Sequence, residues 1–193
     1  MRRGFKASSE RIAAELRSEL GLTVVGRLDP MQLADYLAIP VLTIGQLAVD
    51  TRTDGFAKYF TESDPDSFSA VTIFRGYRRI IVHNESHHPN RQASNLAHEL
   101  SHSILEHGPA PVADAGGQRY WDPEVEAEAS WLGAALLVPR EGALALLKRN
   151  WSLQRIATHF GVSDSLCQWR IRQTGVVLQV KRFRTIYGRA ASG

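Results

Sequence analysis

The first part of the chain places apolar residues at helical spacing. From Ile12 to Leu20 they recur every three or four positions, which is the spacing of one face of an α-helix. Ser8 or Ser9 can cap this helix, and Gly21 can end it. The pattern therefore predicts an amphipathic helix that packs one face against the rest of the protein.

A second helix and a strand are predicted next. Asp29 and Pro30 have the order of a cap and a first-turn residue, and apolar residues continue at helical spacing behind them. Residues 40–44 are apolar and β-branched enough for a short strand. Residues 45–68 carry mixed signals, so we expect a loop-rich segment with one strand at most, near residues 56–60.

Two β-rich runs lie before the middle of the chain. Residues 69–74 and 79–83 are separated by residues 75–78, which contain Gly76 and have the length of a hairpin connection. Together with the helices, this hairpin predicts an α+β fold with a small antiparallel sheet.

The middle of the chain predicts two longer helices. The run from Asn95 to Leu105 has no Gly or Pro, and its helix can begin at Pro89 or Asn90. Gly108 and Pro109 should end it after His107. Two further segments follow: a Gly/Pro/Ala/Asp-rich connection over residues 109–123 and a helix over residues 124–138.

The C-terminal part has the spacing of a helix-turn-helix. A short helix is predicted over residues 141–148, and two more over residues 152–163 and 164–174. Residues 176–180 and 183–187 are β-rich and are joined by two basic residues. We expect them to form a β-hairpin that resembles a wing.

His98 and His102 are the strongest candidates for chemistry. Because a helix advances about 100° per residue, side chains four positions apart lie on the same face. Both imidazoles can therefore bind one metal ion, while the neighbouring Glu99 can take a proton from the attacking water. The alternative is a solvated amphipathic helix, but burying these groups beside a core is costly unless something satisfies them.

A third metal ligand is expected from the helix over residues 124–138. It carries Glu124, Glu126 and Glu128 in its first turns, where glutamates also interact favourably with the helix dipole. Glu126 lies on a face of small residues that lets another helix approach closely, so we choose it and keep Glu128 in reserve. The other residues of that face are Ala129, Ser130, Gly133 and Leu137.

Composition describes an ordinary globular protein. The chain has 193 residues, 44% of them hydrophobic and 22% charged, and one cysteine, Cys167, which we expect in the core. One cysteine permits no internal disulfide and suits a reducing compartment. We see neither an export signal nor an apolar run long enough to span a membrane, so we expect a cytoplasmic protein without a membrane partner.

Charge is distributed unevenly along the chain. From Lys148 onward, nine Lys and Arg residues stand against one acid, Asp164, which gives that segment +8. Since the whole chain has a net charge of +3, the preceding part carries −5. The asymmetry indicates either an acidic or nucleic-acid partner at the C-terminal end, or a solvated basic face.

The two central segments together resemble the ImmA/IrrE family of metallopeptidases. The resemblance rests on Arg-Gln-Ala-Ser-Asn-Leu-Ala-His-Glu-Leu-Ser-His at 91–102 and Glu-Ala-Glu-Ala-Ser-Trp-Leu-Gly-Ala-Ala-Leu-Leu-Val-Pro at 126–139. Ser101, Ser130 and Leu132 are among the departures from the family pattern. None of them removes a candidate ligand or the candidate base.

This resemblance implies a zincin-like domain of the gluzincin type over residues 1–142, followed by a helix-turn-helix-like segment over residues 143–193. It implies Zn²⁺ held by His98, His102 and Glu126, with Glu99 as catalytic base. It also implies that the protein cleaves a helix-turn-helix repressor and so relieves transcriptional repression.

Two other functions fit the residues. The protein could be a DNA-binding regulator that uses its basic C-terminal segment, or it could sequester a repressor without cutting it; in both the zinc site is non-catalytic. For the endopeptidase, a second donor to the developing oxyanion is expected. Tyr120, His107 and Arg91 are the candidates, and the sequence does not choose among them.

Overall fold

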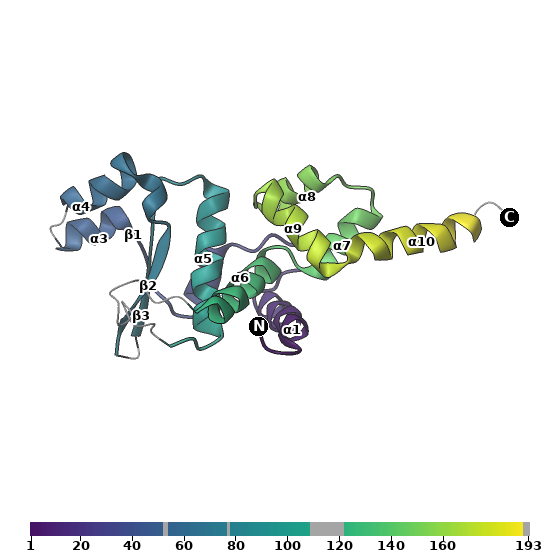
Figure 1. Ribbon diagram of the computed structural model, residues 1–193, viewed down its shortest axis with the longest axis horizontal. Coiled ribbons are helices and arrows are strands. Elements are labelled where there is room, and N and C mark those ends of the chain that lie inside the picture. The colour runs from purple at the N-terminus through teal and green to yellow at the C-terminus, as the bar shows by residue number, and fades with distance from the viewer. Residues whose placement is uncertain (52–53, 77, 109–121, 191–193) are drawn as a thin grey trace.

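The computed structural model describes residues 1–51, 54–76, 78–108 and 122–190. Over these residues the fold is α+β and mostly helical, with one three-stranded sheet. The sheet lies at one end of the molecule, two long helices cross the middle, and a group of C-terminal helices forms the other end (Figure 1). The predicted fold class is thus confirmed at this level.

Two helices open the chain, as predicted. Helix α1 spans Phe5–Glu19 and α2 spans Pro30–Tyr36, where the Asp29 side chain accepts a hydrogen bond from the Met31 amide at 2.9 Å. The predicted cap at Ser8 or Ser9 is wrong, because α1 begins directly after Gly4, whose φ of 80° favours glycine. Ser9 instead lies inside the helix and donates to the Phe5 carbonyl.

The sheet is mixed, which corrects the expected antiparallel sheet. Strand β3 (Arg78–His83) pairs antiparallel with β2 (Ala70–Arg75), as predicted for the hairpin. Strand β1 (Val41–Thr43) is also where the sequence placed it, but it pairs parallel to β3. Within the described residues, the order β1-β3-β2 makes β2 an edge strand.

The expectation of a loop-rich segment with one strand over residues 45–68 is wrong. The segment is helical: α3 (Ile44–Thr51), α4 (Asp54–Lys58), a π-helical turn (Tyr59–Ser63) and a 3₁₀ turn (Pro65–Ser67). Ile44 and Ala48 lie one helical turn apart and pack with Val82 of the sheet in a small second core. Contact with the sheet, rather than local preference, decides this conformation.

The two central helices are α5 (Pro89–Ile104) and α6 (Pro123–Leu137). The Asp122 side chain caps α6 by accepting from the Glu124 and Val125 amides. Helix α5 ends three residues before the predicted boundary, since the chain turns at Glu106 with a φ of 56°.

Helices α5 and α6 pack very closely at Gly133. A Cβ atom at that position would lie 3.1 Å from the Ala97 carbonyl oxygen and 3.2 Å from the His98 amide nitrogen. The small-residue face predicted for α6 is therefore the face that contacts α5.

Four helices form the C-terminal end: α7 (Arg140–Lys148), α8 (Leu153–Phe160), α9 (Asp164–Thr174) and α10 (Val176–Ala190). Helices α8 and α9 lie where the sequence placed two helices, with Gly161 at a φ of 67° and Ser163 capping α9, and their role as a helix-turn-helix stays a prediction. The predicted wing hairpin is wrong, because its residues form α10. Val176 and Val180, one helical turn apart, are both buried.

The main hydrophobic core continues across residue 142. Leu132 and Leu136 of α6 belong to the same cluster as Leu146 of α7 and Ile156 of α8. The division into segments 1–142 and 143–193 stays a prediction. Cys167 is fully buried, as expected, and burial raises the pKa of its thiol to about 11.

Within the described ranges, no single helix has the length and apolar composition of a membrane span. Helices α6 and α7 reach it only when taken together, and they are bent by 44° relative to each other.

Candidate metal centre

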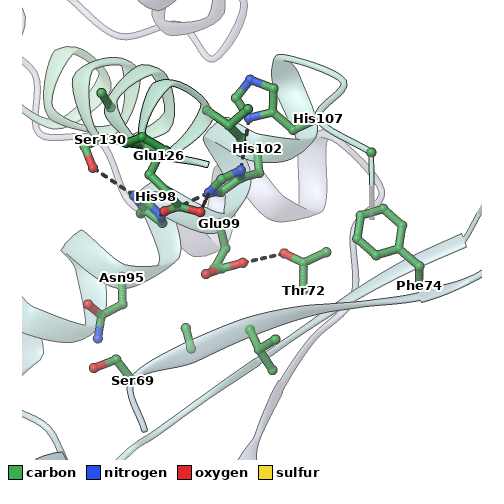
Figure 2. Close-up of a pocket in the computed structure, with 16 residues that line it drawn as sticks. Ser69, Thr72, Phe74, Asn95, His98, Glu99, His102, His107, Glu126 and Ser130 are labelled. Atoms are coloured by element: carbon green, nitrogen blue, oxygen red, sulfur yellow. Dashed lines mark hydrogen bonds and ion pairs between the residues drawn. The ribbon is translucent and has the colours of Figure 1, made fainter. Parts of the chain in front are cut away.

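The side chains of His98, His102 and Glu126 converge between α5 and α6 (Figure 2). The two Nε2 atoms lie 3.0 Å apart, and Glu126 Oε2 lies 3.1 Å from His98 Nε2. Glu126 Oε1 lies 3.7 Å from His102 Nε2, and the candidate ligand atoms of all three residues lie within 4.8 Å of one another. The structure thus brings together the three predicted ligands.

The donor set fits a divalent transition metal. Two imidazole nitrogens and one carboxylate oxygen are ligands that zinc accepts, and a fourth position then stays open for water or substrate. The Nδ1 atoms of both imidazoles make polar contacts with residues outside the cluster. His98 Nδ1 lies 3.3 Å from Ser130 Oγ, and His102 Nδ1 lies 3.0 Å from His107 Nδ1. Such outer contacts orient imidazoles towards a metal.

Burial keeps His102 neutral, as a metal ligand must be. Burial first, and the neighbouring His98 second, lower the pKa of His102 to about 4. A neutral imidazole has one ring nitrogen with a free electron pair, which is what coordination requires.

Glu99 lies next to the cluster but outside the ligand set. Its carboxylate points across the cavity towards strand β2, where Oε2 accepts a hydrogen bond from Thr72 Oγ1 at 2.6 Å (Figure 2). Glu99 follows His98 directly on α5 and lines the same cavity. The geometry is that of a base held beside the metal position, and the role of base stays a prediction.

A cavity of about 750 Å³ contains these groups. Helices α5 and α6 form one wall, and residues of the edge strand β2 form the other. Ser69, Thr72 and Phe74 line the strand side, and Asn95 lies opposite Ser69 at one end (Figure 2). An edge strand offers backbone N–H and C=O groups to an extended peptide, and β2 lines this cavity.

Glu128, the reserve ligand, has another environment. Among the described residues, the cluster that could hold a metal contains Glu126 and not Glu128. Glu128 is buried and binds Arg2 through both carboxylate oxygens, at 3.0 and 2.7 Å. These contacts favour the choice of Glu126, although ligation itself stays a prediction.

The three candidate oxyanion donors differ in position. His107 lines the cavity, with its side chain 11% exposed. Arg91 faces the start of β2, where it pairs with Asp66 and lies 3.2 Å from Ser69 Oγ. Tyr120 lies outside the described residues. Of the two candidates that the structure describes, His107 alone belongs to the cavity lining.

The sequence does not predict that Thr72, Ser130 and Asn95 line the site. Thr72 carries no local signal, because its role depends on how β2 lies against α5. Ser130 was recognised only as a small residue of the contact face. Asn95 lines the cavity, and its Nδ2 atom is buried without a hydrogen-bond partner among the described residues.

Two imidazoles and a carboxylate around one point, a second carboxylate beside them and a cleft along an edge strand define a candidate metallopeptidase centre. The family model for the IrrE N-terminal-like domain, Peptidase_M78, matches residues 47–172, which is well over half of the chain. The chain therefore belongs to this ImmA/IrrE family of metallopeptidases. Neither the curated proteins nor the solved structures yielded a match.

Proposed function

We propose that the protein is a zinc-dependent endopeptidase of the gluzincin type that cleaves a helix-turn-helix transcriptional repressor. The observation that supports the chemistry is the convergence of His98, His102 and Glu126 at one point, with Glu99 beside it. The repressor substrate comes from the family resemblance. Part of the proposal is a cytoplasmic location, which the single buried cysteine suits.

His98, His102 and Glu126 would hold the metal, and two helices fix their positions. Zinc bound there supplies Lewis acidity, which polarises the scissile carbonyl and makes water easier to deprotonate. Strand β2 would align the substrate backbone by strand pairing. Glu99 would accept a proton from the attacking water and pass it to the leaving amine, while Thr72 orients its carboxylate.

The test combines zinc, a repressor and one conservative variant. The purified protein is loaded with zinc, incubated with a helix-turn-helix repressor encoded beside it, and analysed for discrete fragments by mass spectrometry. Glu99→Gln should retain zinc and lower the cleavage rate by at least about 100-fold, because general base catalysis is lost.

The outcomes separate the competing functions. Cleavage that Glu99→Gln abolishes supports the proposal, and cleavage at the wild-type rate by that variant contradicts the assigned base. A stable complex with intact repressor would instead support sequestration.

DNA binding is the second candidate function. Helices α8 and α9 form the expected pair, and Gln168 and Arg172 are exposed on α9, where a recognition helix would present them. If the basic segment contacts phosphates, binding to a DNA duplex should weaken steeply with salt and survive His98→Ala. A His98→Ala variant that loses DNA binding, or binding that ignores salt, would count against this candidate.

A further inference from the structure

A row of polar side chains leads from His102 away from the cavity to the start of the chain. His102 Nδ1 lies 3.0 Å from His107 Nδ1, and His107 Nε2 lies 3.8 Å from Glu128 Oε2. Glu128 in turn binds Arg2 through the backbone amide, Nε and Nη2, at 3.1, 3.0 and 2.7 Å. Three segments far apart in sequence therefore meet behind one of the candidate metal ligands.

The Glu128 carboxylate is held in one position and directs a negative oxygen towards His107. Its side chain is 5% exposed, so solvent hardly screens it. Arg2 contacts both oxygens, which prevents the carboxylate from turning away from His107. A negative oxygen that faces Nε2 of a neutral imidazole favours a proton on that nitrogen.

The proton position on His107 determines that of its neighbour. With the proton on Nε2, His107 Nδ1 has a free electron pair and must accept in the 3.0 Å contact. His102 must then carry its own proton on Nδ1, which leaves the electron pair on Nε2. That is the nitrogen that lies 3.0 Å from His98 Nε2 and 3.7 Å from Glu126 Oε1.

The opposite arrangement would prevent coordination. If His107 donated from Nδ1, His102 Nδ1 would accept, and the His102 proton would lie on Nε2 and point into the cluster. We propose that Glu128 and His107 are positioning residues that set the tautomer of His102 for metal binding. This inference rests on the proposed role of His102 as a metal ligand.

The two candidate histidine ligands differ in this respect. His98 Nδ1 faces Ser130 Oγ at 3.3 Å, and a hydroxyl can either donate or accept. Ser130 can therefore orient His98 without selecting a tautomer. Of the two, His102 is the ligand for which the described residues include a neighbour whose own proton is placed by a buried charge.

The first experiment reads the tautomers directly, without metal and without substrate. Long-range ¹H–¹⁵N correlation spectra of the metal-free wild-type protein, recorded near pH 8, distinguish protonated from unprotonated ring nitrogens. The expected result is a proton on Nδ1 of His102 and on Nε2 of His107. His102 protonated on Nε2, or His107 protonated on Nδ1, overturns the proposal.

The second experiment measures zinc affinity by competition with a chromogenic chelator. His107→Leu should bind zinc about 10- to 100-fold more weakly than wild type, and Glu128→Gln on the order of tenfold. His107→Asn should recover most of the loss, because its Oδ1 can accept from His102 Nδ1. Glu124→Gln, on the same helix and exposed, should bind like the wild type.

The measurements also distinguish a changed tautomer from a loss of folding and from a loss of peptidase activity. Thermal melting of the metal-free variants reports the fold, and a destabilised His107→Leu leaves the decision to Glu128→Gln and the wild-type spectra. Wild-type zinc affinity in both His107→Leu and Glu128→Gln overturns the proposal. Absence of repressor cleavage by a protein with the expected tautomers and affinities contradicts the proposed function alone.

Discussion

Two helix pairs in this protein, α5–α6 and α8–α9, differ in the side chains that they bury. Across the contact of α5 with α6, polar side chains face one another, with His98, Glu126 and Ser130 in the same space. In α8 and α9, Ile156, Phe160 and Ile171 belong to the main hydrophobic core, and the one buried charge of α9, Arg170, is bound by the Val138 carbonyl and Glu10 outside this pair. Polar groups at a helix contact cost stability unless they are satisfied, so their presence indicates a site, while the apolar contact indicates a scaffold.

The largest expected effect comes from removing a candidate ligand. His98→Ala should weaken zinc binding by at least about 100-fold and abolish cleavage, because two ligands do not hold the metal in the open geometry. The melting temperature of the metal-free protein should change little. Metal analysis, cleavage assays and melting curves test this, and full zinc occupancy in the variant would contradict the assignment.

For the pair α8–α9 we expect a loss of stability without a loss of zinc affinity. Ile156→Ala, at a side chain with no exposed surface, should lower the free energy of unfolding by about 2–5 kcal/mol. Zinc affinity of the folded protein should stay close to that of the wild type. Leu153→Ala on the same helix, 37% exposed, is the control and should change stability by less than about 0.5 kcal/mol.

A smaller effect on both properties is expected where α6 touches α5. Gly133→Ala places a methyl group 3.1 Å from the Ala97 carbonyl oxygen, so the helices must separate slightly, which costs about 1–3 kcal/mol. Since each helix carries ligands, zinc affinity should fall as well. Gly55→Ala, in a helix with nothing within 4 Å of the new Cβ, is the matched control. Unchanged affinity in Gly133→Ala would show that the site tolerates helix displacement.

The smallest effect is expected on α10. Lys181→Glu and Arg182→Glu change exposed residues and should each alter the free energy of unfolding by less than about 0.5 kcal/mol. Cleavage by the double variant should equal that of the wild type, whereas any binding to DNA should be lost. A marked fall in cleavage would show that this end of the molecule takes part in substrate recognition.

The sequence predicted the site because most of its geometry is local or periodic. His98 and His102 share a face by helical period alone, and the small residues around Gly133 indicated which face of α6 meets α5. The position of Thr72 could not be predicted, because it depends on the docking of β2 against another element.

The errors in the fold have a related cause. The β-branched residues around Val176 favour a strand, but in the described structure the residues around Val176 and Val180 form no sheet contact and pack their valines into the helical core. Helix α3 forms because one of its faces packs on the sheet. The chain then enters β2 at the end of the sheet where β1 finishes, and the β2–β3 hairpin turns β3 parallel to β1. Each outcome depends on contacts between segments distant in sequence.

The close contact at Gly133 has a thermodynamic consequence for a metal bound between the helices. Because the candidate ligands come from both α5 and α6, metal binding would stabilise the packing of these helices. The packing would strengthen metal binding by the same free energy. Free zinc at about 100 times its dissociation constant would add about 2.7 kcal/mol to the free energy of unfolding. Loss of a metal bound there would therefore loosen the central helix pair, so that the supply of that metal would help to determine how long the folded protein persists.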